Sequence, residues 1–445
     1  VASRFDDRTA YAAINRFRLD DLAPHIFRTR DSGGTWEEIV HGIPGDEVVN
    51  SVREDPVRRG LLYAGTERGV YVSFNDGADW QSLRGNLPAT SVRDLVVHGN
   101  DLVVGTHGRS FWILDDLSAL RELAPRIATA PAHLFRPALA YRLRRNLNTD
   151  TPLPPEEPAG QNPPDGAILD YYLAAATAGP VTLEIFDARG RRVRRYSSAD
   201  QPEPVDARKL AVPTYWVRPA RQLSAAPGMH RFVWDLRYPA PETREQGYPI
   251  SATYEDTPAE PLGPFVLPGR YEARLTVDGK TYKAPLTVKL DPRVKTSPQA
   301  LGQQLALAQQ VAATLSRNTE AAGEIEALHG ELAALPAAAR EGELGKAVTA
   351  FETRLAGLAE GRSRDEDSFP RLGEALFRLY EVIEGADQAP TPQAQKAGVD
   401  LKARAAALLK RWEGVREKDL ADLNRGLAQA GFKPVGSPSG KRQEG

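Results

Sequence analysis

The sequence predicts a multidomain chain that is mainly β in its first two thirds and α in its last third. Three patterns predict this: a repeat of 40 to 50 residues near the start, a strict two-residue alternation in the middle, and apolar stripes at helical spacing near the end. In chain order they predict the last two to three blades of a β-propeller (1–124), a Pro-rich linker (125–165), an immunoglobulin- or fibronectin-like β-sandwich with long insertions (166–292), an antiparallel helical bundle (293–432) and a disordered tail (433–445).

Composition limits the classes of function before any motif is considered. The chain has 445 residues, which is room for about three domains of ~150 residues. It has no cysteine, which excludes disulfides, thiolate metal sites and cysteine nucleophiles. The net charge of −2 gives no reason to expect a nucleic-acid partner, and no apolar run reaches the ~18 residues of a membrane span. The first residues already resemble a strand, so we expect any signal peptide to lie outside this chain.

The first element is an internal repeat. The string at residues 62–71, LYAGTERGVY, is echoed at residues 103–112 by VVGTHGRSFW, and a looser copy at residues 10–14 reads AYAAI. Short strands repeated at this period have the size of a four-stranded propeller blade. The repeat therefore predicts propeller blades over residues 1–124.

Two copies of the repeat contain a more specific motif. Residues 29–36 (motif 1) fit the pattern Ser/Thr-x-Asp-x-Gly-x-Thr-Trp, and residues 73–80 (motif 2) repeat it with Asn in the Asp place and Asp in the Thr place. A short Asp or Asn side chain accepts backbone N–H groups two residues on, Gly supplies positive φ, and Trp buries its ring under the turn. We therefore expect both motifs to be structural hairpins, through Thr29, Asp31, Gly33, Trp36, Ser73, Asn75, Gly77 and Trp80.

These residues resemble the Asp-box (BNR) repeat superfamily, which includes sialidases, xyloglucanases and sortilin-type propellers. A more specific resemblance is to large bacterial proteins labelled sortilin-like or BNR-repeat glycosyl hydrolases. It is carried by GTHGRSFWILDD at residues 105–116, NPPDGA at 162–167 and HRFVWDLR at 230–237. The resemblance implies that the chain is the C-terminal part of such a protein. It also implies that the remaining blades lie upstream or come from another chain.

The middle of the chain predicts an extended linker followed by a β-sandwich. Prolines crowd residues 131–164, which favours extended backbone. Alternating apolar positions at 271–277 and 282–290 flank Asp278-Gly279, a dipeptide typical of two-residue hairpin turns. Together with strands near 169–173, 181–185 and 231–236, this predicts six or seven strands, with insertions at 201–227 and 238–264.

From residue 297 the apolar period changes to that of a helix. Ser297 is followed by Pro298, the arrangement of an N-cap with Pro in the first helical position. Four stripes at three- and four-residue spacing follow, in residues 325–335, 348–358, 372–383 and 408–415. They predict an antiparallel bundle. The last residues are polar and Gly-rich, which predicts disorder.

The order of strands in a blade predicts which loops could contact a ligand. If each motif joins the third and fourth strands of a blade, the loop between the second and third strands opens at the opposite end. We name residues 15–24, 66–68 and 106–109 the mouth loops. Their arginines favour a carbohydrate or protein ligand, because guanidinium groups bind carboxylates bidentately. The alternative is that these are solvated charges, or ion pairs such as Arg18 with Asp20. The candidates are Arg16, Arg18, Asp20, Asp21, Glu67, Arg68, His107 and Arg109.

No catalytic residue is assigned. The pairs Asp20-Asp21 and Asp115-Asp116 do not establish the two separated carboxylates of a glycosidase. The histidines show no metal-binding spacing, so neither a metal nor a cofactor is expected. Two hypotheses remain open. The first is a non-catalytic binding and structural segment of a periplasmic or secreted propeller protein. The alternative is part of a glycoside hydrolase whose catalytic carboxylates lie mainly in the missing upstream blades.

Overall fold

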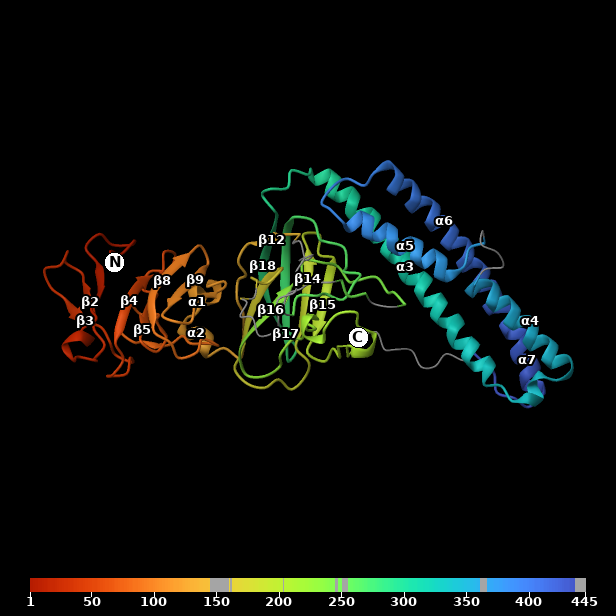
Figure 1. Ribbon diagram of the computed structural model, residues 1–445, viewed down its shortest axis with the longest axis horizontal. Helices are drawn as coiled ribbons and strands as arrows, with labels where there is room; N and C mark the ends of the chain where they lie inside the picture. Colours follow the sequence, from red (N-terminus) through yellow and green to blue (C-terminus); the bar gives the residue numbers. More distant parts are fainter. Residues whose placement is uncertain are drawn as a thin grey trace.

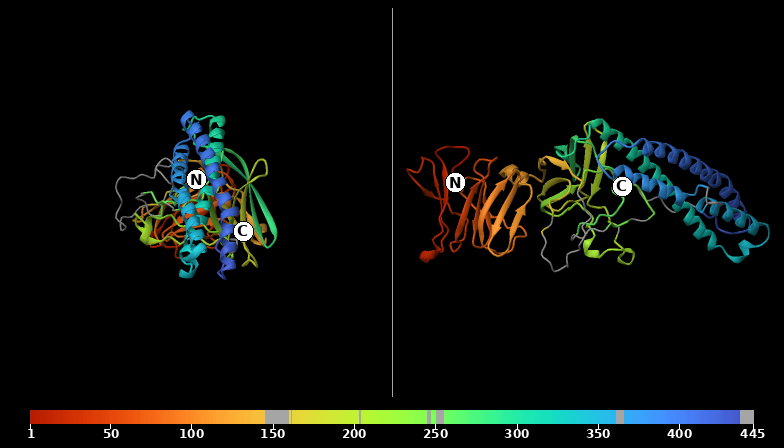
Figure 2. Two further views of the ribbon diagram at one scale, coloured as in Figure 1. Left: turned by 90° about the vertical axis from the view of Figure 1, so that its right-hand side faces the viewer. Right: turned by 45° about the horizontal axis from the view of Figure 1, so that its top comes forward.

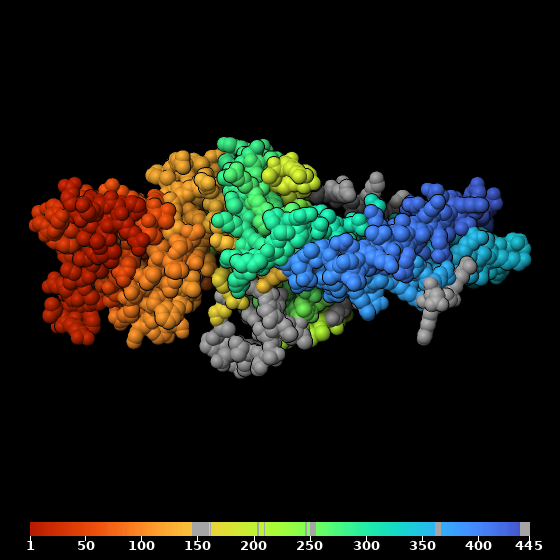
Figure 3. All heavy atoms as spheres, turned by 90° about the horizontal axis from the view of Figure 1, so that it is seen from above, coloured from red at the N-terminus to blue at the C-terminus, as the bar shows by residue number. Residues whose placement is uncertain are grey.

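The computed structural model describes residues 1–144, 160, 162–202, 204–244, 247–249, 255–360 and 366–436. The chain is elongated and multidomain (Figure 1). Small antiparallel sheets form its N-terminal end, a domain of one three-stranded and one five-stranded sheet lies in the middle, and long helices form the other end. Seen from above in Figure 3, the three parts follow one another along the long axis.

The N-terminal part consists of three antiparallel sheets that stand side by side (Figure 2). Sheet 1 contains β1 (Ala10–Ala13), β2 (Ile26–Thr29) and β3 (Glu37–Glu38), with the short helix η1 (Phe17–Leu19) between β1 and β2. Sheet 2 contains β4 (Val49–Glu54), β5 (Leu62–Thr66), β6 (Val70–Ser73) and β7 (Gln81–Ser82). Sheet 3 contains β8 (Val92–His98), β9 (Asp101–Thr106) and β10 (Phe111–Leu114).

Two apolar cores hold these sheets together. Sheet 1 packs Tyr11 and Ile26 against Leu62 and Ala64 of sheet 2. The other face of sheet 2 packs against sheet 3 through a second cluster, which includes Tyr63, Val70, Val72, Leu95 and Val104. The alternation of side chains along each strand explains why sheet 2 contributes to both cores.

Both motifs form hairpins, but only one buries its tryptophan. In motif 1 the N–H of Thr35 donates to Asp31 over 2.8 Å, so the bond spans four residues rather than the predicted two. Gly33 has a φ of +91°, as the turn requires. Trp80 of motif 2 is 5% exposed, whereas Trp36 of motif 1 is 48% exposed. The prediction that Trp36 lies buried is therefore wrong, because in the described part of the chain no further sheet packs against motif 1.

The middle domain has two sheets around one core, which includes Leu169, Leu183, Trp234 and Ala273. One sheet has the order β11-β13-β16: β11 (Ala132–Leu134), β13 (Ala167–Leu173) and β16 (Gly228–Trp234). The other has the order β12-β18-β17-β14-β15: β12 (Ala140–Arg142), β18 (Lys280–Leu290), β17 (Gly269–Val277), β14 (Thr182–Asp187) and β15 (Arg192–Ser197). Short helices η2 (Ala207–Lys209) and η3 (Thr214–Trp216) lie in the connection before β16.

The segment predicted as a linker differs from that prediction. Sheet 3 is followed by α1 (Ser118–Glu122) and α2 (Pro125–Ala128), and then by β11 and β12, which belong to the sheets of the middle domain. β12 pairs in parallel with β18. Strands of three residues are too short to produce a recognisable alternation, which is why the prolines dominated the prediction. Residues 145–159 and 161 of the predicted linker lie outside the described residues.

Long helices form the C-terminal part. They are α3 (Pro298–Ala333), α4 (Gly342–Ala359), α5 (Phe369–Glu384), α6 (Pro392–Gly414) and α7 (Ala421–Gln429), with η4 (Ala337–Arg340) and a π-helical turn at Val415–Leu420. The hydroxyl groups of Ser297 and Thr391 cap α3 and α6. One apolar cluster joins the helices. Within the described part of the chain, no helix is both long and apolar enough to cross a membrane.

The start of the predicted tail is ordered. The N–H and the carbonyl of Val435 both bond to the side chain of Asn424, over 2.8 Å each, and Val435 is buried. A single apolar residue in a polar, Gly-rich stretch gives too weak a signal to predict this contact. Residues 437–445 of the predicted tail lie outside the described residues.

Candidate functional site

The mouth loops lie at the ends of the strands opposite to the two motifs, because the strands of each sheet are antiparallel. Side chains link these loops across all three sheets. Asn15 donates to Asn50 over 2.6 Å, Asn50 donates to Glu67 over 2.9 Å, and Arg93 pairs with Glu67 at 3.1 Å. Glu67 is therefore engaged within the protein, by sheets 2 and 3 together.

The connection between β1 and β2 carries its own charged network. Arg16 pairs with Asp21 at 3.0 Å, and His25 lies between Asp21 at 3.0 Å and Glu38 at 2.7 Å. The hydrogen bond from His25 lowers the pKa of Asp21, and the hydrogen bond to Glu38 raises the pKa of His25. Arg16 and Asp21 thus neutralise each other within the loop.

Arg68 is also paired, at 2.9 Å to Asp46 and 3.4 Å to Glu47. Arg18 contacts the ring of Phe17, and no ion pair joins it to Asp20 among the described residues. Asp20 has a φ of +57° and ends the short helix before it. Arg16 and Arg68 are thus ion-paired loop charges, which was the alternative to ligand contacts. Their partners are Asp21 for Arg16, and Asp46 and Glu47 for Arg68.

The third mouth loop remains open. His107 and Arg109 are exposed, and within the described chain neither has an ion-pair partner. The backbone of Arg109 is fixed instead: its N–H donates to Thr106 Oγ1 over 3.1 Å, and its carbonyl accepts the indole N–H of Trp112 over 2.9 Å. This loop therefore offers an exposed cation on a fixed backbone.

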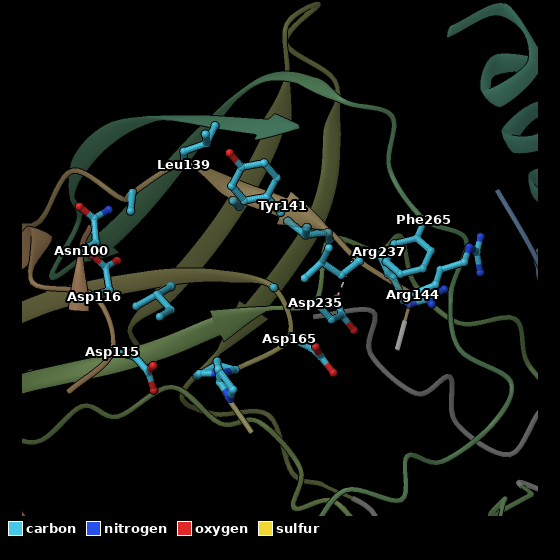
Figure 4. Close-up of a pocket in the computed structure, with 18 of the residues that line it drawn as sticks. Asn100, Asp115, Asp116, Leu139, Tyr141, Arg144, Asp165, Asp235, Arg237 and Phe265 are labelled. Atoms are coloured by element: carbon cyan, nitrogen blue, oxygen red, sulfur yellow. Dashed lines mark hydrogen bonds between the residues drawn. The ribbon is translucent and has the colours of Figure 1, made fainter. Parts of the chain in front are cut away.

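A second candidate site lies where the three parts of the molecule meet. A cavity of about 520 Å³ opens between sheet 3, the middle domain and the end of α5 (Figure 4). Its wall includes Asp115-Asp116, Asp165-Gly166 and Asp235-Leu236-Arg237. These belong to the three sequence phrases that carried the family resemblance, although none of them was predicted as a site. Only the fold brings them together.

Arg231 joins sheet 3 to the middle domain beside this cavity. Its guanidinium donates to the carbonyls of Asp115 over 2.6 Å and Asp116 over 3.1 Å. The same group pairs with Asp170 at 2.9 Å, within β13. Asp170 fixes the Arg231 guanidinium within the middle domain, and the guanidinium bonds to two carbonyls beyond sheet 3. Arg231 therefore holds sheet 3 and the middle domain in one relative orientation.

The turn after β16 forms one wall of the cavity under backbone strain. Leu236 has a φ of +59°, a region that bulky residues rarely adopt. The N–H of Arg237 donates to the carboxylate of Asp235 over 3.3 Å, which tightens the turn. Gly166 is required opposite, because a Cβ there would lie 2.0 Å from the carbonyl oxygen of Trp234. Strain of this kind persists where the surrounding structure holds it in place.

Three guanidinium groups surround one aromatic ring at the other end of the cavity. Arg237 lies 3.4 Å from the centre of the Phe265 ring, Arg144 lies 4.7 Å from it and Arg142 lies 4.9 Å from it. Burial lowers the pKa of Arg237 to about 10. Such stacking is favourable for arginine because its planar cation lies against the ring face.

Carboxylates from the end of α5 compensate these arginines. Asp387 pairs with Arg142 and, at 2.6 Å, with Arg144, while Glu384 lies 3.4 Å from Arg237. Burial acts to raise the pKa of Asp387, but the two arginines hold it below its usual value. This cluster fastens the helices to the middle domain.

The cavity was not predictable from the sequence. Its polar residues come from several separate segments between Asn100 and Arg237 and share no spacing rule. Adjacent aspartates at 115 and 116 were considered only as a catalytic pair. No group of three or more His, Asp or Glu residues in the described part of the chain is arranged to hold a metal ion.

Comparisons with known proteins do not assign this chain to a family. No family model and no curated protein sequence matches the chain. Among solved structures, YCF48 bound to D1 peptide matches 21% of this chain at 18% identity, with a TM-score of 0.17. An ancestral GH74 enzyme matches 43% at 16% identity, with a TM-score of 0.18. The extracellular domain of a protein from B. thetaiotaomicron, described as a hybrid two-component system, matches 65% at 9% identity, with a TM-score of 0.18.

The matches span only part of those structures, namely 30%, 26% and 32% of their chains. TM-scores this low do not establish a common fold over the whole chain, and they say nothing about activity.

Proposed function

We propose that this chain is a binding and structural segment of a larger Asp-box β-propeller protein that acts outside the cytoplasm, and that it is not itself catalytic. In this proposal sheets 1–3 are propeller blades, and the remaining blades come from upstream sequence or from another chain. The middle domain is an immunoglobulin-like sandwich and the helices form an antiparallel bundle, both accessory to the propeller. The ligand at the propeller mouth is a carbohydrate or a protein.

The observation that carries the proposal is a pair of apolar sheet faces without a neighbour. Trp80 lies against sheet 1, with its indole N–H donating to the carbonyl of Ile39 over 2.8 Å. Trp36 occupies the same place in motif 1 but is 48% exposed. By analogy, Trp36 needs a further sheet to cover it.

Sheet 3 supplies the complementary face. The register pairs Gly65 with Val70 in sheet 2 and Gly105 with Phe111 in sheet 3, so Val70 and Phe111 are equivalent positions. Val70 is covered by sheet 3 and is 2% exposed, whereas Phe111 is 79% exposed. Exposed apolar faces at both ends of a stack of sheets are expected of blades separated from their neighbours.

The electrostatics of the mouth loops and their neighbours argue against two carboxyl groups, Asp21 and Asp46, as the acid of a glycosidase. A glycosidase acid must hold its proton near neutral pH, which requires a raised pKa. The hydrogen bond from His25 lowers the pKa of Asp21, and the hydrogen bond from Arg68 lowers that of Asp46. Both groups are therefore ionised and paired, which suits them to hold the loops in place.

Oxidative footprinting with mass spectrometry tests the proposed architecture. In the purified 445-residue chain, hydroxyl radicals should modify Trp36 and Phe111 rapidly and Trp80 slowly. In the protein isolated from its native source, further blades should protect Trp36 and Phe111. Equal labelling of these two residues in both preparations would contradict the proposal.

Ligand binding at the mouth is tested on glycan and protein arrays. Arg109→Ala should weaken binding of any ligand that the native protein recognises there, by about tenfold, since a charge-assisted hydrogen bond is lost. Arg189→Ala, in the hairpin turn between β14 and β15, is the matched control for loss of an exposed arginine. Unchanged binding by Arg109→Ala would remove this loop from the site.

A further inference from the structure

The outer face of the five-stranded sheet is strongly basic. Buried and more exposed residues alternate along β17, so Arg270 and Arg274 lie on the face opposite the core. The register of β14, β15 and β18 continues this face and places Glu184 and Glu272 on it as well. We name as the basic face the six cations that it carries: Arg192, Arg195, Arg270, Arg274, Lys283 and Lys289. Against two carboxylates they leave four positive charges in excess, in a chain whose net charge is −2.

The two carboxylates serve one half of the basic face. Glu184 pairs with Arg192 at 3.0 Å. Glu272 pairs with Arg274 at 2.6 Å and lies 4.0 Å from Lys283. Arg274 and Lys283 lie directly opposite each other on neighbouring strands, an arrangement of like charges that is destabilising. One shared carboxylate therefore has to offset the repulsion between two cations.

The other half of the basic face has no carboxylate partner. In the described part of the chain, no ion pair or hydrogen bond engages the side chain of Arg195, Arg270 or Lys289. Arg270 and Lys289 are exposed, and Arg195 is half-buried. Cations held together on one face repel one another, and a bound anion would offset this repulsion.

Arg274 is held in place at the centre of this face. Its guanidinium lies 3.8 Å from the centre of the Phe186 ring, and its Nε donates to Glu272 over 2.6 Å. Its two terminal nitrogens have no acceptor in the described part of the chain, and they are not buried. A guanidinium group fixed on an aromatic ring with two free donors is suited to bind a carboxylate bidentately.

The arrangement of the cations favours an extended ligand. They lie on β15, β17 and β18, with β14 between, and neighbouring strands are about 4.8 Å apart, so the basic face is about 14 Å wide. Arg270 and Arg274 are about 13 Å apart along their strand. An exposed ion pair contributes little on its own, so a small anion would bind weakly. Charges linked in one chain bind together, because each contact after the first is intramolecular.

The other side chains on this face distinguish between classes of polyanion. A single-stranded nucleic acid binds through stacked aromatic rings, and the ring of Phe186 is already covered by Arg274. Acidic peptides are bound at sheet edges or in grooves, whereas the basic face offers side chains in the middle of a sheet. Thr287, opposite Arg270, adds an exposed hydroxyl group beside the cations. Cations beside a hydroxyl group suit a ligand that carries both carboxylates and hydroxyls.

We propose that the basic face binds an acidic polysaccharide, a linear chain of sugars that carry carboxylates. Arg274 binds one carboxylate bidentately, and the cations without partners bind further carboxylates along the chain. This site belongs to the middle domain and lies outside the propeller mouth, so it does not rest on the function proposed above.

Calorimetric titration of the full chain with oligogalacturonate tests the site. The oligomer should bind at low salt and lose affinity steeply as salt is added, because exposed charges are screened. The same oligomer with its carboxyl groups methyl-esterified should bind about tenfold more weakly or worse, since its charges are gone. Esterification leaves the protein untouched, so a loss of affinity does not reflect misfolding.

Variants separate the basic face from the net charge of the chain. The first variant replaces three of its cations with exposed side chains: Arg270→Gln, Lys283→Gln and Lys289→Gln. The control removes the same charge from exposed positions of α6: Lys396→Gln, Lys402→Gln and Lys410→Gln. The first variant should weaken binding of oligogalacturonate by about tenfold, because several exposed ion pairs are lost, and the control should leave it almost unchanged.

Four outcomes would overturn the proposal. Two concern the ligand: no binding of oligogalacturonate at millimolar concentration and low salt, or equal affinity for the charged and the esterified oligomer. The third is an equal loss of affinity in both variants, which would make the binding an effect of net charge. The fourth is equal or tighter binding of polyglutamate or oligothymidylate with the same number of charges, which would assign the basic face to an acidic protein or to a nucleic acid.

Discussion

Motif 1 and motif 2 have nearly the same sequence and the same turn, yet they differ in what surrounds them. In both, a Thr or Ser hydroxyl accepts the glycine N–H over 2.9 Å, and Asp31 or Asn75 accepts an N–H four residues on. Motif 2 lies against sheet 1, whereas in the described part of the chain no further sheet lies against motif 1. The comparison teaches that the motif determines the hairpin and that the next sheet determines burial of the tryptophan.

The position before the glycine differs as well. Asp76 of motif 2 bonds to the hydroxyl of Tyr11 and to Arg28 at 3.0 Å, both in sheet 1, and to Arg30 of motif 1 at 2.8 Å. Motif 1 has Ser32 at this position, and its backbone N–H donates to Arg8. Asp76 therefore joins the two sheets by ion pairs, which Ser32 at the equivalent position of motif 1 cannot form.

The largest expected difference between the motifs comes from removing each tryptophan. Trp80→Ala should lower the free energy of unfolding of sheets 1 and 2 by about 3–5 kcal/mol, the usual cost of deleting a buried aromatic ring. Trp36→Ala should cost clearly less than this in the isolated chain, because Trp36 is already 48% exposed. Hydrogen exchange of residues 1–116 under urea measures both. Equal costs would contradict the role assigned to the neighbouring sheet.

A smaller difference is expected for the charged network. Asp76→Asn should destabilise the contact between sheets 1 and 2 by about 2 kcal/mol, because charged hydrogen bonds to the buried Arg28 are lost. Ser32→Asn is the matched substitution in motif 1 and should have almost no effect. The same hydrogen-exchange experiment reports both values, and a large effect of Ser32→Asn would show a contact that the comparison omits.

The two motif glycines sharpen the comparison further. Both have positive φ, so alanine costs about 1 kcal/mol at each position. At Gly77 a Cβ would also lie 2.3 Å from Ile39 Cδ1, whereas at Gly33 the nearest atom is 3.9 Å away. Gly77→Ala should therefore cost about 1–3 kcal/mol more than Gly33→Ala. Hydrogen exchange of the same peptides during thermal unfolding of the two variants measures which substitution costs more.

The smallest effect concerns pH and should appear only in sheet 1. Hydrogen bonding to Glu38 raises the pKa of His25 above its ordinary value of 6.5. The stabilisation by protonated His25 is thus complete below about pH 6.5 and is lost as pH rises through the raised pKa. At the alkaline end of this window, residues 14–25 should be less protected against amide hydrogen exchange. The free energy of protection should fall by less than about 1 kcal/mol. His25→Gln should abolish the dependence.

The sequence predicts the features that depend on short-range interactions and misses those that depend on contacts between distant segments. The hairpins of the two motifs and the turn at Asp278-Gly279 depend on contacts within a few residues, and the structure has them where the pattern placed them. The exposure of Trp36 depends on a sheet that the motif does not encode. β11 and β12 are too short to show a period.

The candidate sites show the same limit. The loop at His107 and Arg109 was predictable from the repeat, since its position follows from strand order. The pairing of Arg16 with Asp21 rather than of Arg18 with Asp20 depends on loop conformation. Arg144 and Asp235 approach the same cavity only through the packing of domains, and no pattern along the chain brings them together.

Acrylamide quenching of tryptophan fluorescence in the isolated chain tests most directly whether the neighbouring sheet, and not the motif, buries the ring. Spectra of Trp36→Phe and Trp80→Phe variants, subtracted from the parent spectrum, isolate each of the two emissions. The emission of Trp36 should be red-shifted and strongly quenched, and that of Trp80 blue-shifted and protected. Equal quenching of the two tryptophans would contradict the difference between the motifs.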